Sequence, residues 1–563
     1  MSFCARMLLP AGIFLVALAA FLPALDAEFL NWDDDINFLG NSGFRGLGWP
    51  QLKWMWTATL MGHYIPLTWM SLGLNYALGG MDPWGYHLGN MLLHAANAVV
   101  VYFVARRLLI AAGASAGAPG SWGAAFAALV FGVHPLRVES VAWITERRDV
   151  LCALFFLLAV WTYLISVDRV RRPGWRAASV VLFAAALLAK AQAVPLPLAL
   201  LLLDAYPLRR IGVIGWRRSI AEKLPYFALS LAAGVVAIAA IRHAITFTDY
   251  AQYGPGARLA MMAYAILFYP SKWLWPMGLS PLYELPARVD PLAGRFLEAI
   301  VVLALATAAL VALRRRWPAG LAVWSYSALM VLPVVGPLHA GNQLAHDRYS
   351  YLSGLGFAVL AGGALAWALG ALARGSLRPL VGRAVACAAG VVVLGLGSAT
   401  LIQTSEWRDS GTLWAMAVDQ DPECAVCLNN LAQALASQGN LDAAEHAFRR
   451  SLALRERPMT RNNLGGVLQV RGQFEAAERE YRLALRMQPD LREALANLGD
   501  LYVRQGRTEE ARPLFLRLVE IAPDFPRAGA TLRALREEGG EQVRVGRGAD
   551  AEGPSRGAPR AGR

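Results

Sequence analysis

Residues 177–203 read AASVVLFAAALLAKAQAVPLPLALLLL, and this stretch decides the class of the fold. About 20 consecutive apolar residues suffice for a helix to cross a bilayer. This run is too long for one comfortable span, and Lys190, Pro195 and Pro197 interrupt it. A lysine is costly inside a membrane and a proline breaks a helix. We therefore expect two short helices with Lys190 at their tip; the alternative is a single long span.

Further apolar runs surround this stretch and predict a multi-span helical membrane domain over residues 1–403. Hydrophobic residues make up 56% of the 563 residues and charged residues 17%, against about 25% in soluble domains. With 177–203 counted as two spans, the total is about eleven, and 259–277 is expected to be interfacial or re-entrant. The other runs are 7–25, 87–105, 123–133, 150–166, 225–241, 296–313, 319–338, 351–373 and 383–402.

The net charge of +13 comes entirely from the membrane part. Residues 1–403 hold 30 Lys+Arg and 17 Asp+Glu, whereas residues 404–563 hold 23 of each. Such an excess is typical of cytoplasmic loops and does not call for nucleic acid as a partner. The loop with Arg209, Arg210, Arg217, Arg218 and Lys223 is expected inside. The C-terminal part then lies outside: the periplasm for a bacterial inner membrane, or the lumen for an endoplasmic reticulum membrane.

The C-terminal part contains three copies of a 34-residue pattern that is typical of tetratricopeptide repeats. The second copy reads NNLGGVLQVRGQFEAAEREYRLALRMQP. We expect an α-solenoid, and hence an all-α protein. The expected segments are a degenerate leading repeat or linker at 404–424, repeats at 425–457, 458–491 and 492–525, and a helix remnant with a disordered tail at 526–563.

An asparagine occupies the same position in each repeat, at Asn430, Asn463 and Asn497. An amide pairs with both N–H and C=O of an extended backbone. The ladder therefore predicts binding of a protein acceptor or partner, and hydrogen bonds within the repeat are the equally weighted alternative. Cys424 and Cys427 form a lone CxxC, for which we favour two small residues at a helix start over zinc; a disulfide would require an oxidising compartment.

Four polar clusters interrupt the apolar runs on the expected outer face. Charged residues near span ends indicate sites because they are costly in membranes. For each single residue a structural ion pair is an alternative role, and for the aspartates a solvated acidic loop or a metal site. The candidates are Asp33, Asp34 and Asp35; His63, Tyr64 and His87; His134, Glu139, Arg147, Arg148 and Asp149; and His346, Asp347 and Arg348.

The motifs WDD, PLTW, GYHL, HPLRVESVAWITERRDVL, LLAK, LLLLDAYPLRR, EKLP and DRYSYL, followed by tetratricopeptides, occur in this order. The chain thereby resembles, over roughly residues 10–530, the transmembrane-and-tetratricopeptide-containing protein O-mannosyltransferases and their bacterial relatives. Such proteins resemble GT-C glycosyltransferases, which use a polyprenyl-phosphate sugar and an acidic residue in the first outer loop. Bacterial relatives often have Lys-Pro where this chain has Lys190-Ala191.

The resemblance implies inverting transfer of a mannose-like sugar to Ser or Thr of extracytoplasmic proteins. Asp33 or Asp34 would act as the general base, with Asp35 leaving that choice open. Cationic side chains would stabilise the leaving phosphate. No cofactor is implied, and a divalent metal at the aspartates stays an alternative. Transfer to a lipid or surface glycan, or a non-catalytic scaffold, are the other functions considered. The expected phosphate-binding residues are Arg147, Arg148, Arg348, Lys190 and His346.

Overall fold

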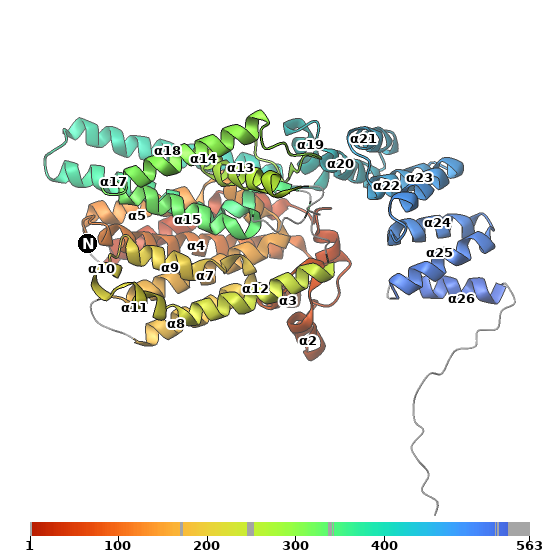
Figure 1. The fold of residues 1–563 in the computed structure, drawn as a ribbon, viewed down its shortest axis with the longest axis horizontal. Coiled ribbons are helices and arrows are strands. Elements are labelled where there is room, and N and C mark those ends of the chain that lie inside the picture. Colours follow the sequence, from red (N-terminus) through yellow and green to blue (C-terminus); the bar gives the residue numbers. More distant parts are fainter. Residues whose placement is uncertain are drawn as a thin grey trace, which may run out of the picture. The chain divides into compact units, whose positions relative to one another are not determined.

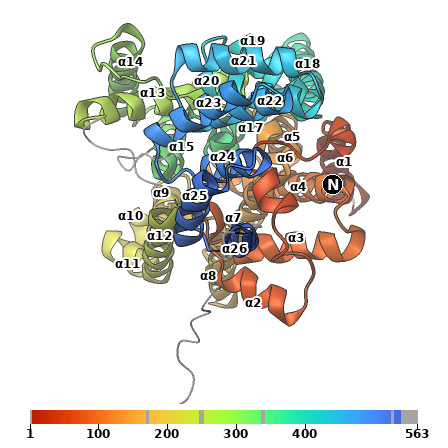
Figure 2. The ribbon, with the colours of Figure 1, turned by 90° about the vertical axis from the view of Figure 1, so that its right-hand side faces the viewer.

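The structure is a computed structural model that describes residues 3–168, 173–244, 253–335, 341, 343–523, 525 and 528–538. Helices dominate, and two short strands, β1 (Tyr283–Glu284) and β2 (Gln343–Ala345), pair antiparallel. The predicted all-α class is therefore confirmed. The chain divides into two compact units, residues 1–434 and 435–563, each of which is described by itself (Figures 1 and 2).

The first unit is a bundle of long helices with shorter elements between them. Its long helices are α1 (Phe3–Ala19), α4 (Pro83–Ala111), α5 (Ala118–Gly132), α7 (Arg147–Ser166), α8 (Pro173–Ala189), α12 (Leu224–Ala244), α13 (Pro255–Leu274), α14 (Gly294–Ala312), α15 (Pro318–Val335), α17 (Leu355–Ala373) and α18 (Pro379–Ser405). The shorter ones are η1 (Leu22–Asp26), η2 (Asp35–Leu39), α2 (Trp49–Thr57), η3 (Leu60–Gly62), α3 (Pro66–Gly79), η4 (Pro135–Arg137), α6 (Val138–Ala142), η5 (Ile144–Glu146), η6 (Ala191–Ala193), α9 (Leu196–Ala205), α10 (Ile211–Ile214), α11 (Trp216–Ala221), η7 (Asp347–Tyr349), α16 (Ser350–Ser353), α19 (Ser410–Gln420) and α20 (Ala425–Ser437).

Seven helices of the described residues are long and apolar enough to cross a membrane, so the protein is a multi-pass membrane protein. They are Pro83–Ala111, Ile144–Ser166, Leu224–Arg242, Gly294–Ala312, Pro318–Val335, Leu355–Ala373 and Pro379–Ser405. The bent pair Ala118–Gly132 and Pro135–Ala142 would make an eighth. The prediction of eleven spans also counts α1, α8 and α9, which are apolar but shorter, and it stays a prediction.

The predicted break at Lys190 is confirmed. Helix α8 ends at Ala189, a short 3-10 turn follows, and α9 begins at Leu196. Pro195 and Pro197 lie at and just after the start of α9, where a missing N–H costs no helical hydrogen bond. The run 259–277 forms most of helix α13, which is not among the candidate spans.

Two ends of the first unit differ in charge. At the polar end lie the loop 28–48, the segment 133–149, Lys190 and the segment 343–349. At the arginine-rich end lie the turns after α9, α14 and α17, with Arg210, Arg314–Arg316 and Arg374. In Figure 1, α2 and α3 mark the polar end, and α10 and α11 the arginine-rich end. Helix α17 runs from one end to the other, and its length sets Leu355 and Arg374 about 28 Å apart along the helix axis.

A buried ion network closes the arginine-rich end. Asp204, at the end of α9, accepts hydrogen bonds from Lys223, Arg210, Tyr163 and Ser219. These partners come from α7, α11 and the turns beside α9 and α12, so the network fastens these elements to one another. Because each group of this set is paired, we assign it a structural role.

The second unit begins with α21 (Leu441–Leu454) and ends with α26 (Ala528–Glu538). Between them lie two helical hairpins, α22 (Pro458–Val470) with α23 (Phe474–Met487) and α24 (Arg492–Arg504) with α25 (Thr508–Ile521). The repeat pattern has a direct steric cause. A Cβ atom on Gly465 would lie 2.6 Å from the Tyr481 ring, and one on Gly499 would lie 2.7 Å from Phe515. Only a small residue therefore allows the two helices of a repeat to pack. The tail expected to be disordered after residue 540 lies outside the described residues.

Candidate active site at the polar end

The three aspartates after α1 have different surroundings. Asp34 is fully buried and accepts hydrogen bonds from Thr145 Oγ1 (2.6 Å), Trp143 Nε1 (3.0 Å) and the Leu30 backbone N–H (3.0 Å). Burial raises the pKa of Asp34 to about 7, although these three donors favour the carboxylate. Asp35 is exposed and accepts only from its neighbour's backbone N–H among the described contacts. Asp34 thus anchors the loop to the segment around Trp143.

Asp33 is the aspartate left available for chemistry. Its backbone has φ of 69°, a left-handed conformation that is uncommon for residues other than glycine and that concentrates at functional sites. Its side chain is half-buried, and no hydrogen bond to it occurs within the described residues. Burial raises the pKa of Asp33 above its ordinary value, while Arg148 and Arg348 lower it. The result is a carboxylate that accepts no described hydrogen bond and feels the positive charges of two guanidinium groups.

Glu146, which belongs to the third polar cluster of the sequence but was not among the expected site residues, is the centre of a buried charge network. Its Oε1 accepts from Arg148 Nη2 at 2.6 Å and lies 3.3 Å from Arg348 Nε, and its Oε2 accepts from Lys190 Nζ at 2.9 Å. Lys190 also donates to Asp149 Oδ1 at 2.6 Å. The break between α8 and α9 thus delivers Lys190 to the start of α7, as its predicted position at the tip implies.

Arg348 joins the network from the segment after β2. It donates through its side chain and its backbone N–H to Glu139, and its guanidinium lies 5.3 Å from the centre of the Trp143 ring. His346 donates from Nδ1 to the Pro281 carbonyl at 2.8 Å, with the Glu139 carboxylate 3.4 Å away. Burial lowers the pKa of His346, which favours the neutral imidazole. Arg148, Lys190 and Arg348 therefore converge, with three carboxylates among them.

Arg147 points away from this network. It donates to the side-chain oxygens of Asn90 and Asn75 and to the Tyr86 carbonyl, all on α3 and α4. Consecutive residues of a helix do not face each other, so Arg147 and Arg148 at the start of α7 serve different partners. The structure does not bring Arg147 together with the other expected phosphate ligands.

A small hollow of about 10 Å³, room for about one water molecule, lies beside Arg148. Its lining includes His63, Asn37, Thr145 and Thr68. Burial, and then the charges of Arg148 and Lys190, hold the pKa of His63 well below its usual value. The neutral His63 imidazole and the Arg148 guanidinium are therefore the polar groups available to a ligand in this hollow.

Three of the remaining candidates have hydrogen-bond partners of their own. Tyr64 donates to the Trp56 carbonyl, His134 stacks on Trp273 and is bonded to its carbonyl at 3.0 Å, and Asp347 accepts from Tyr283 at 3.0 Å. Burial raises the pKa of Asp347 well above its usual value. The His87 ring is buried in α4 beside the backbone of residues 27, 28 and 142. Of these four, none contacts Glu146 through a described hydrogen bond or ion pair.

The aspartate loop is fastened to α19, a contact that no sequence pattern indicated. Trp414 Nε1 donates to Asn31 Oδ1 at 2.7 Å, and the Asn31 backbone N–H donates to Ser410 Oγ at 2.9 Å. Trp32 packs edge-on against Trp414 and stacks with Trp143. The degenerate leading repeat is therefore part of the same body as the loop that carries Asp33.

The three repeat asparagines are partly engaged with other amides. Asn430 is buried in the first unit, where its carbonyl accepts from Asn31 at 3.0 Å. In the second unit, Asn497 donates to Asn462 at 2.9 Å, and Asn462 donates to Asn463. Asn463 and Asn497 are half-buried. The role of the ladder in binding an acceptor stays a prediction.

Cys424 and Cys427 form a disulfide at the start of α20. This is the interpretation that the sequence analysis ranked below two unlinked small residues, so the favoured interpretation is wrong. A CxxC pair brings two thiols close enough to bond when the first lies just before a helix. Within the described residues, no group of three or more His, Cys, Asp or Glu side chains is arranged to hold a metal ion.

Comparison with known proteins assigns the two parts of the chain. Residues 66–241 match the family described as dolichyl-phosphate-mannose-protein mannosyltransferase. Residues 424–457 and 456–524 match tetratricopeptide repeat families. Human protein O-mannosyl-transferase TMTC4 is 26% identical over 493 residues, covering 76% of this chain and 64% of TMTC4. The chain is homologous to the TMTC proteins.

Mouse TMTC2 is 35% identical over 162 residues, which cover 26% of this chain but 18% of the length of TMTC2. The chain therefore spans less than two thirds of each of these two relatives. Among solved structures, ArnT from Cupriavidus metallidurans, bound to undecaprenyl phosphate, is similar at 17% identity with a TM-score of 0.33, covering 81% of this chain and 76% of ArnT.

Proposed function

We propose that the protein is a membrane glycosyltransferase that moves a mannose-like sugar from a polyprenyl-phosphate donor to Ser or Thr hydroxyls of extracytoplasmic proteins. The observation that carries the proposal is the Asp33 carboxylate, which accepts no described hydrogen bond and interacts electrostatically with Arg148 and Arg348 of the charge network. The homology to protein O-mannosyl-transferases supports the reaction class.

In the proposed reaction, an Asp33 oxygen takes the proton from the acceptor hydroxyl. The acceptor oxygen then forms a bond to the anomeric carbon from the face opposite the phosphate, and the bond between that carbon and the phosphate oxygen breaks. The electron pair leaves with polyprenyl phosphate, so configuration inverts. A base with a raised pKa suits this role because it is a better proton acceptor than an ordinary carboxylate.

The donor phosphate is assigned to the surroundings of Arg148, where the small hollow must widen to take it. Negative charge grows on the phosphate as the bond breaks, and preorganised cations stabilise it without reorganising. Arg148 lines the hollow. Lys190 and Arg348 are linked to Arg148 through Glu146, which contacts all three cations. His63, neutral because of burial, is assigned a hydrogen bond to the phosphate or the sugar. Asp34 positions the loop and is not assigned the base.

The polar end is assigned to the outer side of the membrane, because the arginine-rich loops favour the cytoplasm. The disulfide near the start of the repeats agrees with an oxidising compartment on that side. The repeats would then present the acceptor protein on the same side as Asp33. For a bacterial chain this is the periplasm, with the bundle in the inner membrane.

The test uses purified full-length protein in lipid nanodiscs with a polyprenyl-phosphate mannose carrying a labelled sugar. Transfer to a protein acceptor is followed by mass spectrometry. Asp33→Asn is expected to abolish transfer, whereas Asp35→Asn, which changes an exposed neighbour, retains it. Normal turnover in Asp33→Asn would refute the base assignment. If labelled sugar is found only on lipid or glycan, the acceptor is a lipid or glycan and not a protein. If the wild type does not turn over the donor, the protein is better explained as a non-catalytic scaffold.

A further inference from the structure

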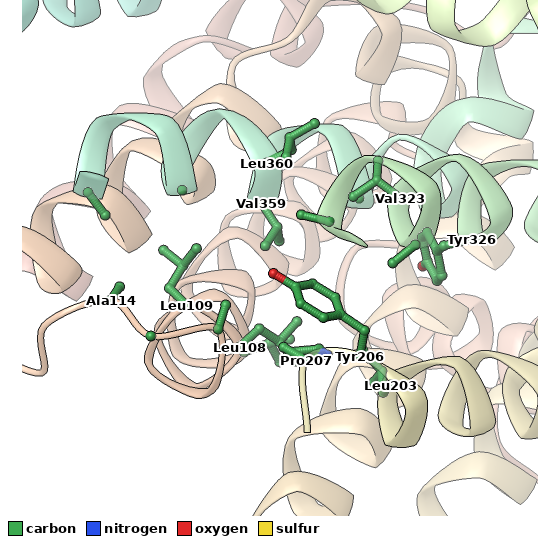
Figure 3. Close-up of a pocket in the computed structure, with 18 of the residues that line it drawn as sticks. Leu108, Leu109, Ala114, Leu203, Tyr206, Pro207, Val323, Tyr326, Val359 and Leu360 are labelled. Atoms are coloured by element: carbon green, nitrogen blue, oxygen red, sulfur yellow. The ribbon is translucent and has the colours of Figure 1, made fainter. Parts of the chain in front are cut away.

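An apolar cavity of about 580 Å³ lies between α4, α7, α9, α15 and α17, away from the polar end (Figure 3). Ligand sites usually measure roughly 300–1,000 Å³ and are mostly apolar. Leu108, Leu203, Val323, Val359 and Leu360 are among the residues that line it. The proposed reaction uses none of these residues, so the cavity calls for a separate explanation.

The two ends of the cavity differ. Phe156 and Leu355, which are buried, close it on the side of the polar end. Trp367, which is 68% exposed, and exposed Arg374 lie at the other end. On α17 the lining runs from Leu355 to Arg374, about 28 Å along the helix axis. The cavity is therefore elongated parallel to the helices, as a lipid chain is, and its mouth is at the arginine-rich end.

Two polar groups at this mouth lack partners. The Tyr206 side chain extends into the cavity, as Figure 3 shows, and its hydroxyl makes no hydrogen bond within the described residues. The Arg374 guanidinium likewise makes no described hydrogen bond or ion pair to a side chain. A guanidinium is a strong phosphate ligand, and a phenol hydroxyl donates well to an ester carbonyl. Trp317, beside the mouth, is a residue type that concentrates at membrane interfaces.

We propose that this cavity binds one anionic glycerophospholipid, with an acyl chain between α4, α9, α15 and α17, an ester near Tyr206 and the phosphate at Arg374. The donor of the proposed reaction does not fit the same position, because its phosphate belongs at the opposite, polar end. The exclusion of the donor rests on the proposed function, whereas the cavity and its lining do not. A bound chain would fill the space between α9 and α15, whose lining atoms otherwise lack contacts on one side.

The test compares phosphatidylglycerol with phosphatidylcholine of the same acyl chains by native mass spectrometry and by thermal unfolding of the full-length protein. The wild type is expected to retain one phosphatidylglycerol and to show a higher Tm with it than with phosphatidylcholine. Val359→Trp, which fills the cavity, should abolish both effects. Arg374→Gln should weaken the preference for phosphatidylglycerol roughly tenfold or more, because a charge-assisted hydrogen bond is lost.

Matched controls keep the result interpretable. Leu394→Trp adds the same side chain at an exposed position of α18, and Arg378→Gln removes a nearby exposed charge that does not line the cavity. Both should behave as the wild type. If Val359→Trp fails to fold, Ala364→Phe fills the same cavity from its exposed side. Unchanged retention in the filled variant, no retained lipid in the wild type, or displacement of phospholipid by equimolar polyprenyl phosphate would each overturn the proposal.

Discussion

Replacing Arg148 or Arg147 with glutamine separates a role in the reaction from a role in the fold. The two arginines are adjacent, have the same charge and are 6% and 3% exposed. Arg148 contacts Glu146 and the hollow with His63, whereas Arg147 contacts only neutral oxygens on α3 and α4. We expect both variants to lose stability, because each breaks buried contacts, but only Arg148→Gln to lose turnover per folded molecule.

The magnitudes follow from these contacts. Removing one preorganised donor from a developing negative charge costs about 10²–10³ in kcat, or about 2.7–4 kcal/mol. Arg148→Gln should fall in this range if Arg148 faces the leaving phosphate. Arg147→Gln leaves the buried Asn90 amide oxygen, the half-buried Asn75 amide oxygen and the Tyr86 carbonyl without their donor. At about 1–3 kcal/mol for each unpaired group, folding should weaken by about 3 kcal/mol or more.

The assay is transfer from polyprenyl-phosphate mannose in nanodiscs, with kcat expressed per folded molecule, together with thermal unfolding of each variant. Arg148→Lys and Arg147→Lys test whether charge alone suffices. A lysine at 148 restores a point charge, whereas one at 147 reaches fewer of the three oxygens. Equal loss of kcat in the two glutamine variants, or a kcat of Arg148→Gln close to that of the wild type, would refute the reasoning.

Three further outcomes are expected. Turnover of the wild type should rise with pH through the raised pKa of Asp33, because the base acts only when ionised; a flat profile in a pH series contradicts the assignment. Trp414→Phe should lower kcat while the repeats keep their circular dichroism, since it removes the hydrogen bond to Asn31 that holds the aspartate loop; full kcat argues against that coupling. Alkaline phosphatase fused after residue 405 should be active and fused near residue 212 inactive; the reverse pattern reverses the topology.

The sequence predicted the features that local physics determines. Lys190 with Pro195 and Pro197 ends one helix and starts another whatever surrounds it, and the structure has that break. Gly465 fits its repeat because Tyr481, sixteen positions on, packs against it at tetratricopeptide spacing. Both patterns act over short distances along the chain, so a reading of periodicity and helix breakers finds them.

Roles that depend on distant partners were not predictable in this way. Asp33 and Asp34 look equivalent in sequence. However, Trp143 and Thr145, more than 100 residues away, donate hydrogen bonds to Asp34 and not to Asp33. The left-handed backbone of Asp33 then turns its side chain elsewhere. Helical geometry could have warned that Arg147 and Arg148 do not share one ligand, because adjacent residues on a helix face different sides.

The charge network by itself does not decide between catalysis and a structural role. Arg148, Lys190 and Arg348 are balanced by Glu139, Glu146 and Asp149, as burial in a membrane protein requires, because an uncompensated buried charge is costly.

Asp33 breaks this balance. A network that only stabilised the fold would gain nothing from a fourth, half-buried carboxylate held at a positive φ without a hydrogen-bond donor. The strain and the missing partner make sense if a substrate hydroxyl supplies the donor. The case for an enzyme therefore depends on Asp33 more than on the cluster of cations, and it is Asp33→Asn that most directly decides it.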